Sequence, residues 1–318
     1  MSPSRIVISV SLAAVVLFAA HRAYVAVTDA PVGTSTSAET PPLRGAASRI
    51  NNDAPVIHQL NVSDLQSMTP KLGNPLERSD NLRAIYERFR DSRYGFERSV
   101  AFRAWSACFP QFMSADGHAV SLEKLTAALP VNAPNNAARI DAYRELRRRC
   151  EPFFELSRDD VIAFTQRQSD LWKKGEALDP GELALKYLKA DDKPKALAVV
   201  RDVLSSRDAY AIASMREFVH QFLVLQVDAQ ALPSNTRTDL KSLGLTVAAC
   251  DLGLDCSEQS LTALQLCAHS GYCSGSVVDR YGQSLPNPTD RERLTEESRR
   301  VAAAIASGDL KALGLVVE

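Results

Sequence analysis

Residues 248–273, AACDLGLDCSEQSLTALQLCAHSGYC, contain four of the six cysteines in this chain of 318 residues. The two ends of the segment, AACDLGLDC and QLCAHSGYC, share one pattern. Each has a cysteine at a helix end, a glycine three or four residues later, and a second cysteine six residues after the first. Glycine commonly ends helices because it adopts the left-handed conformation at little cost. We therefore expect the chain to turn back at Gly253 and Gly271, which brings the cysteines of each pair together.

This pattern predicts the disulfides Cys250–Cys256 and Cys267–Cys273. A crossed pairing, Cys250–Cys267 with Cys256–Cys273, is the alternative, and it would tie two adjacent helices together. Both pairings stay open at this point, because cysteine number and spacing do not determine connectivity.

The remaining cysteines, Cys108 and Cys150, pair by elimination, and their bridge would join two helices of the first half of the domain. All six cysteines follow the hydrophobic N-terminal segment. An even number of cysteines in an exported chain is typical of disulfides that form in an oxidising compartment. The sequence thus predicts three disulfides.

A zinc-binding module is a competing interpretation of the same cysteines. Zinc ligands that act as a pair are usually separated by two to four residues, whereas five residues separate each pair here. We therefore predict no metal site and no other cofactor. The alternative module would use four thiolates, those of Cys250, Cys256, Cys267 and Cys273.

The N-terminus has the composition of a targeting segment. Residues 6–20, IVISVSLAAVVLFAA, carry no charge and follow Arg5, which fits the basic and apolar regions of a secretory signal. The run can also extend to Val27, long enough for a membrane anchor with its N-terminus inside. Residues 1–27 are thus predicted to be a signal peptide or a membrane anchor, and the membrane is a predicted partner.

Residues 28–77 are rich in Pro, Ser, Thr and Asn and show little periodicity, so they are predicted to be a flexible spacer. The spacer would hold the following domain away from the membrane. The expected location is the periplasmic side of the bacterial inner membrane, or outside the cell if the N-terminal segment is cleaved.

Residues 78–318 show helical periodicity almost throughout and few strand signals. We expect an all-α domain of about ten helices, arranged as an irregular bundle or as stacked helical hairpins, and divisible into residues 78–150 and 151–318. Capping residues mark the expected helix starts. They are Ser79, Ser121, Asn136 or a neighbour, Ser157, Asp179, Asp191 or Asp192, Asp208, Thr238 or Asp239, Ser257, and Thr289 or Asp290.

Charge is unevenly distributed along the domain. Residues 78–150 carry 13 Lys and Arg against 8 Asp and Glu, whereas residues 151–318 carry 19 against 25. The overall net charge of −1 provides no field that favours nucleic acid, so no nucleic-acid partner is expected. The opposite charges can attract each other within one domain, or the first half can present a basic docking face.

Arg147, Arg148 and Arg149 form the densest positive cluster, and they are candidate binding residues for a phosphate or an acidic partner. Alternatively, they form the solvated last turn of a helix, where the helix dipole favours positive charge. Glu182, Asp202 and Glu217 offer no close carboxylate pair with a spacing suited to acid/base catalysis.

No catalytic residue is assigned, because no complete catalytic motif occurs in the chain. A non-enzymatic protein-binding or scaffold module is therefore the first functional hypothesis, since helical hairpins can build concave surfaces for protein partners. The alternatives are a cell-envelope hydrolase that uses His269, also a candidate binding residue, and the zinc module. The sequence resembles no family that we can name.

Overall fold

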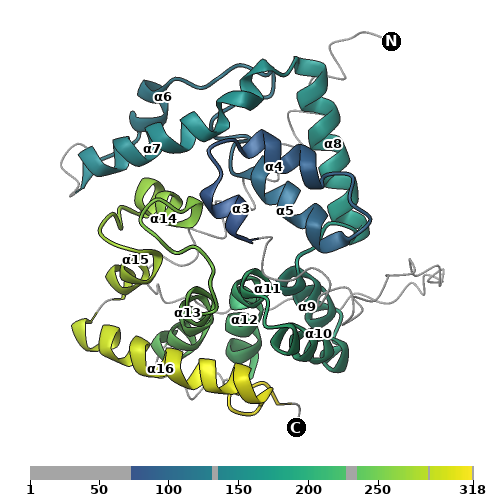
Figure 1. Ribbon diagram of the computed structural model, residues 1–318, viewed down its shortest axis with the longest axis vertical. Helices are drawn as coiled ribbons and strands as arrows, with labels where there is room; N and C mark the ends of the chain where they lie inside the picture. The colour runs from purple at the N-terminus through teal and green to yellow at the C-terminus, as the bar shows by residue number, and fades with distance from the viewer. Residues whose placement is uncertain (1–72, 131–134, 227–234, 286, 317–318) are drawn as a thin grey trace, which may run out of the picture. The chain divides into compact units, whose positions relative to one another are not determined.

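The computed structural model describes residues 73–130, 135–226, 235–285 and 287–316 (Figure 1). The chain divides into two units, Met1–Ala54 and Pro55–Glu318, and every described residue belongs to the second. The described part is all-α, as predicted, and contains no β-strand beyond one isolated bridge between Met113 and Ala119.

The first helices surround an aromatic core. They are α3 (Gly73–Arg78), α4 (Leu82–Phe89), α5 (Gly95–Ser106), α6 (Leu122–Thr126), α7 (Asn136–Cys150), the 3₁₀ turn η1 (Glu151–Glu155) and α8 (Arg158–Lys174). The remaining elements are α9 (Pro180–Lys189), α10 (Lys193–Ser206), α11 (Ala209–Ser214), α12 (Arg216–Gln226), α13 (Asn235–Asp251), α14 (Leu261–Gln265), the π-helical turn η2 (Leu266–Ser270), α15 (Val277–Ser284) and α16 (Pro288–Ser307).

The bundle is irregular but includes hairpins. Helices α4 and α5 pack as one hairpin and α9 and α10 as another, whereas α13 packs along α16, which lies four elements later in the chain. The elements are more numerous than the ten expected. One reason is that the apolar stretch after Asp208 breaks at Met215 into α11 and α12.

Local capping chemistry explains most helix starts. The predicted caps that accept a backbone N–H from the first turn are Ser121, Ser157, Asp179, Asp192 and Asp208. Four predicted caps are wrong. Thr238 or Asp239 and Thr289 or Asp290 lie inside α13 and α16, which begin at Asn235 and Pro288. Asn81 rather than Ser79 caps α4, and Ser260 rather than Ser257 caps α14, because their side chains lie within reach of the backbone N–H three residues later.

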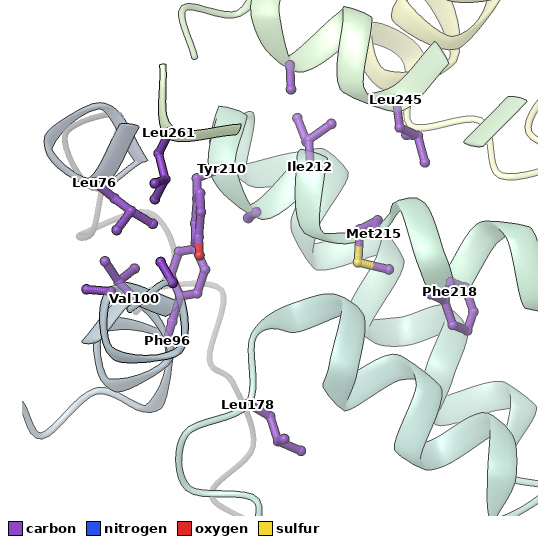
Figure 2. Close-up of a cluster of buried hydrophobic side chains, with 14 of the residues drawn as sticks. Leu76, Phe96, Val100, Leu178, Tyr210, Ile212, Met215, Phe218, Leu245 and Leu261 are labelled. Atoms are coloured by element: carbon purple, nitrogen blue, oxygen red, sulfur yellow. The ribbon is translucent and has the colours of Figure 1, made fainter. Parts of the chain in front are cut away.

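The hydrophobic core is continuous across the predicted boundary at residue 150. Figure 2 shows Leu76, Phe96 and Val100 from the first half beside Tyr210 and Leu261 from the second. One cluster of buried side chains runs from Leu76 to Leu315. The two halves thus share a core, and burial of their apolar faces favours this arrangement.

The predicted signal or anchor at residues 1–27 and most of the predicted spacer lie outside the described residues. The end of the spacer does not match its prediction, since residues 73–77 belong to α3, where Leu76 is buried. In the part of the chain that the structure describes, no helix is both long enough and apolar enough to cross a bilayer.

The three predicted disulfides are confirmed. Cys250 pairs with Cys256 and Cys267 with Cys273. Gly253 and Gly271 adopt the left-handed backbone conformation at the turn within each pair, so the crossed alternative is wrong. The third bridge joins Cys108, just after α5, to Cys150 at the end of α7. Three disulfides indicate an oxidising, extracytoplasmic location.

Candidate functional site

The three arginines predicted as a binding cluster lie in the last turn of α7, and each is bonded to other residues of the chain. Arg147 donates from Nε to the backbone oxygen of Val120 at 3.0 Å. Arg148 forms ion pairs with Asp80 and with Glu145, each at 2.7 Å. The three side chains therefore do not form one free basic surface.

Arg149 is a structural link, with only 3% of its surface exposed. Its Nε donates to Glu145 at 3.0 Å, and its Nη atoms donate to the backbone oxygens of Glu77 at 3.1 Å and Gln259 at 2.7 Å. A buried guanidinium needs such partners, because an unpaired buried charge is costly. Arg149 thus joins α3 and α7 to the segment before α14.

Other arginines of the basic first half also bind the second half. Arg78 forms an ion pair with Asp255 at 2.6 Å. Arg139 donates to the backbone oxygens of Ala268 and His269 at 3.1 and 3.0 Å. These contacts support attraction between the oppositely charged halves within one domain.

His269 lies exposed in η2, beside the disulfide Cys267–Cys273. Its Nδ1 is 3.5 Å from the amide nitrogen of Gln111, and its ring meets Tyr143 edge-on with centroids 5.8 Å apart. A hydrolase would need a nucleophile and an orienting carboxylate around this imidazole. The hydrolase hypothesis stays a prediction.

The four cysteines of the alternative zinc module form two disulfides, so they provide no thiolate that could bind a metal. Elsewhere in the described ranges, no group of three or more His, Cys, Asp or Glu side chains is placed to hold a metal ion.

The candidate site is a different set of side chains, none of which was predicted from the sequence. This arginine–tyrosine cluster consists of Arg103 in α5, Tyr210 in α11, Arg216 in α12 and Tyr281 in α15. The Arg103 guanidinium lies over the Tyr210 ring, 5.6 Å from its centroid, and the Arg216 guanidinium lies 4.5 Å from the centroid of Tyr281. Arg216 Nη1 also donates to the Tyr281 hydroxyl at 2.7 Å.

Two members of the cluster have unused hydrogen-bonding capacity. The Tyr210 side chain is 3% exposed, and its buried hydroxyl has no hydrogen-bond partner. Burial raises the pKa of this phenol, so the hydroxyl keeps its proton and can donate it. The Arg103 guanidinium makes no hydrogen bond or ion pair with any residue that the structure describes. A buried polar group without a partner is unusual and calls for a ligand or water.

The carboxyl groups that act on Arg103 electrostatically include Glu77 and Asp179, and both already have donors. Glu77 accepts from the backbone nitrogen and the hydroxyl of Thr262 at 2.8 and 2.9 Å. Asp179 accepts from the backbone nitrogen of Glu182 at 2.8 Å, and Glu182 accepts from that of Asp179 at 3.0 Å. The carboxyl groups near Arg103 therefore attract its charge without forming a hydrogen bond to its guanidinium.

Asp179 and Glu182 form a capping box at the start of α9, in which each carboxylate accepts the backbone N–H of the other residue. The signal was present in DPGE at residues 179–182, because an N-cap Asp followed three residues later by Glu is typical of this box. Burial, together with the Glu182 carboxyl, raises the pKa of Asp179 to about 7.

This raised pKa predicts how stability depends on pH. The folded-state pKa of Asp179 is about 7, well above the ordinary unfolded value of about 3.9. The stability contributed by the protonated group is therefore fully present below about pH 4 and is lost as pH rises through about 7. In Asp179→Asn the cap is kept, since Asn is also a good N-cap. Denaturant unfolding across this range should show a flatter pH dependence for the variant.

Asp192→Asn is the matched control, because Asp192 also caps a helix. Its ion pair with Lys195 at 2.7 Å lowers its pKa, so its charge does not change in the same window. Equal pH slopes for the wild type and Asp179→Asn would contradict the prediction.

A hollow of about 400 Å³ between α15 and α16 is a weaker candidate. Its polar walls are already bonded within the chain. Ser276 and Asp279 form the capping box of α15. Gln283 donates to the backbone oxygen of Ser274 at 2.7 Å, and Arg291 donates from Nε to the backbone oxygen of Gly282 at 3.0 Å.

The arginine–tyrosine cluster thus combines a buried hydroxyl that has no hydrogen-bond partner with two guanidinium groups that lie over tyrosine rings. The site has to be interpreted from its own geometry, because no protein-family model, no curated protein and no solved structure matches this chain.

Proposed function

We propose that this protein is a non-enzymatic protein-binding module that acts outside the cytoplasm. Its three disulfides support an oxidising location. On this proposal residues 1–27 anchor the chain in the bacterial inner membrane, and residues 28–77 extend the helical domain into the periplasm.

The observation that carries the binding proposal is the exposed Trp172 near the end of α8. Its side chain is 45% exposed, and its indole nitrogen donates to Glu182 Oε1 at 3.3 Å. Helix α8 is a surface helix in which only Val161 and Gln168 are fully buried. An exposed tryptophan that a hydrogen bond orients loses little freedom on binding, and tryptophan is enriched among the residues that dominate protein interfaces.

Site-specific photo-crosslinking in the native cell tests this proposal. A photoreactive amino acid at position 172 should give a discrete adduct with one partner, which mass spectrometry identifies. The control is position 163 on the same helix, where Ala163 is also exposed. With the purified partner, Trp172→Ala should weaken binding about 30-fold, which corresponds to about 2 kcal/mol. Equal adducts at both positions, or unchanged affinity, would contradict the proposal.

The location is tested separately by protease treatment of intact spheroplasts. The helical domain should be digested while a cytoplasmic marker survives, and the N-terminal fragment should remain in the membrane fraction. Protection of the whole chain would contradict a periplasmic domain without bearing on Trp172.

A further inference from the structure

We propose that the hollow between α15 and α16 binds a free α-amino acid with an apolar side chain. Arg291 binds the carboxylate of this ligand, and Asp279 binds its ammonium group. The proposal is independent of the protein-binding role above. It rests on two oppositely charged side chains that line one cavity together with apolar side chains.

The hollow is large enough for a small ligand, and it lies between two helices that pack against each other (Figure 1). Its volume of about 400 Å³ is near the lower end of the range for ligand pockets, roughly 300–1,000 Å³. Val278, Asp279 and Gly282 line it from α15, and Arg291 and Leu294 line it from α16. A ligand in this hollow therefore contacts both helices.

Bonds within the chain hold the polar walls in place, but these bonds leave charged atoms free. Asp279 Oδ2 accepts from the backbone nitrogen and the hydroxyl of Ser276 at 2.8 and 2.7 Å, and no described residue donates to Oδ1. Arg291 donates only from Nε, so its two Nη atoms have no hydrogen-bond partner among the described residues. The hollow thus offers one anionic acceptor and one cationic donor.

The spacing of these charges suits a zwitterion. Among the described residues, no ion pair joins Asp279 to Arg291. Arg291 bonds the backbone oxygen of Gly282, which follows Asp279 by three residues, or about 4.5 Å along the helix axis. A zwitterion can pair with both groups at once, whereas Asp279 repels a simple anion and Arg291 repels a simple cation. The planar guanidinium also matches the two oxygens of a carboxylate.

The apolar walls and the neighbouring disulfides complete the site. Val278 and Leu294 provide apolar surface for the side chain of the ligand. The backbone N–H of Val277 donates to the backbone oxygen of Cys256 at 2.9 Å, and Ser274, which also lines the hollow, follows the disulfide-bonded Cys273. Both short disulfide loops therefore hold the start of α15, so a ligand has little of the site to order.

Calorimetric titration of the full chain with leucine, isocaproate and isopentylamine tests the proposal. Isocaproate is leucine without its amino group, and isopentylamine is leucine without its carboxylate. We expect leucine to bind with a dissociation constant below about 1 mM. Each analogue should bind about 10-fold more weakly, because it lacks one of the two charged groups that the hollow pairs.

Two variants separate binding from structural damage. Arg291→Met should weaken leucine binding about 10-fold without weakening isopentylamine binding, because that probe has no carboxylate. Asp279→Asn keeps an oxygen that can accept from Ser276, and it should weaken leucine binding about 10-fold without weakening isocaproate binding. The control is Arg299→Met, since Arg299 is exposed on the same helix as Arg291 and does not line the hollow.

Three results would overturn the proposal. The first is no heat of binding with leucine at concentrations up to about 10 mM. The second is isocaproate binding as tight as that of leucine, which would indicate a site for simple anions. The third is an equal loss of leucine affinity in Arg291→Met and Arg299→Met. If Arg291→Met does not fold, the affinities of Asp279→Asn for leucine and isocaproate decide the question.

Discussion

Replacing Cys108 and Cys150 together by alanine is expected to cost about 4 kcal/mol of unfolding free energy, more than the loss of either other disulfide. The bridge closes a loop with a sequence separation of 42 residues, whereas the other two close loops with a separation of 6. In the chain-entropy description, a disulfide restricts the unfolded chain more when its loop is longer, which gives about 4 kcal/mol for the long loop and about 2 kcal/mol for a short one.

The surroundings of this bridge add to the expected effect. Cys108 and Cys150 are fully buried. The bridge joins the ends of α5 and α7. Trp105 in α5 and Phe153 in η1, which follows α7, meet edge-on with ring centroids 5.3 Å apart. Alanine leaves space where the sulfur atoms were, and contacts around that space are lost. Aromatic packing in the first half should therefore loosen with the bridge.

Denaturant unfolding of the double variant, monitored by tryptophan fluorescence, measures this cost. The matched control is Cys250→Ala with Cys256→Ala, which removes a short-loop bridge. A smaller cost for the long-loop variant than for the control would contradict the loop-entropy argument, and would mean that native contacts rather than loop closure decide the effect.

Gly181→Ala is expected to destabilise the protein by about 3 kcal/mol, although alanine is usually the better residue in a helix. Gly181 lies in the first turn of α9, where the helix packs against the end of α11. A Cβ atom at this position would lie 1.9 Å from the backbone oxygen of Ser214, and backbone atoms cannot move aside as a flexible side chain can. The two helices would have to separate.

Gly282→Ala provides the control for Gly181→Ala, since Gly282 is also inside a helix. Its nearest neighbour would be a side-chain atom of Arg291 at 3.7 Å, an ordinary contact distance, so this variant should gain about 0.5–1 kcal/mol. Thermal and denaturant unfolding of both variants would give opposite signs. A neutral Gly181→Ala variant would mean that α9 and α11 do not need this close approach.

Features that depend on residues near one another in the chain were predictable from the sequence. The glycine turns at Gly253 and Gly271 bring together cysteines six residues apart, so the short bridges follow from local geometry. Helix caps act over three residues, and five of the ten predicted caps accept a backbone N–H as expected. Two caps that were not predicted, Asn81 and Ser260, each lie two or three residues from another plausible cap, and composition alone does not choose between such neighbours.

The sequence by itself thus determined the helical class, most helix starts and the local disulfides. Only the tertiary structure decided the roles of the arginines. Arg149 is buried where α7 packs against α14, and its guanidinium reaches the backbone of α3. Arg103 meets Tyr210, 107 positions later in the chain, because α5 and α11 share one core. The physical reason is that helix formation and capping are local, whereas the direction in which a polar side chain points depends on which apolar faces pack together.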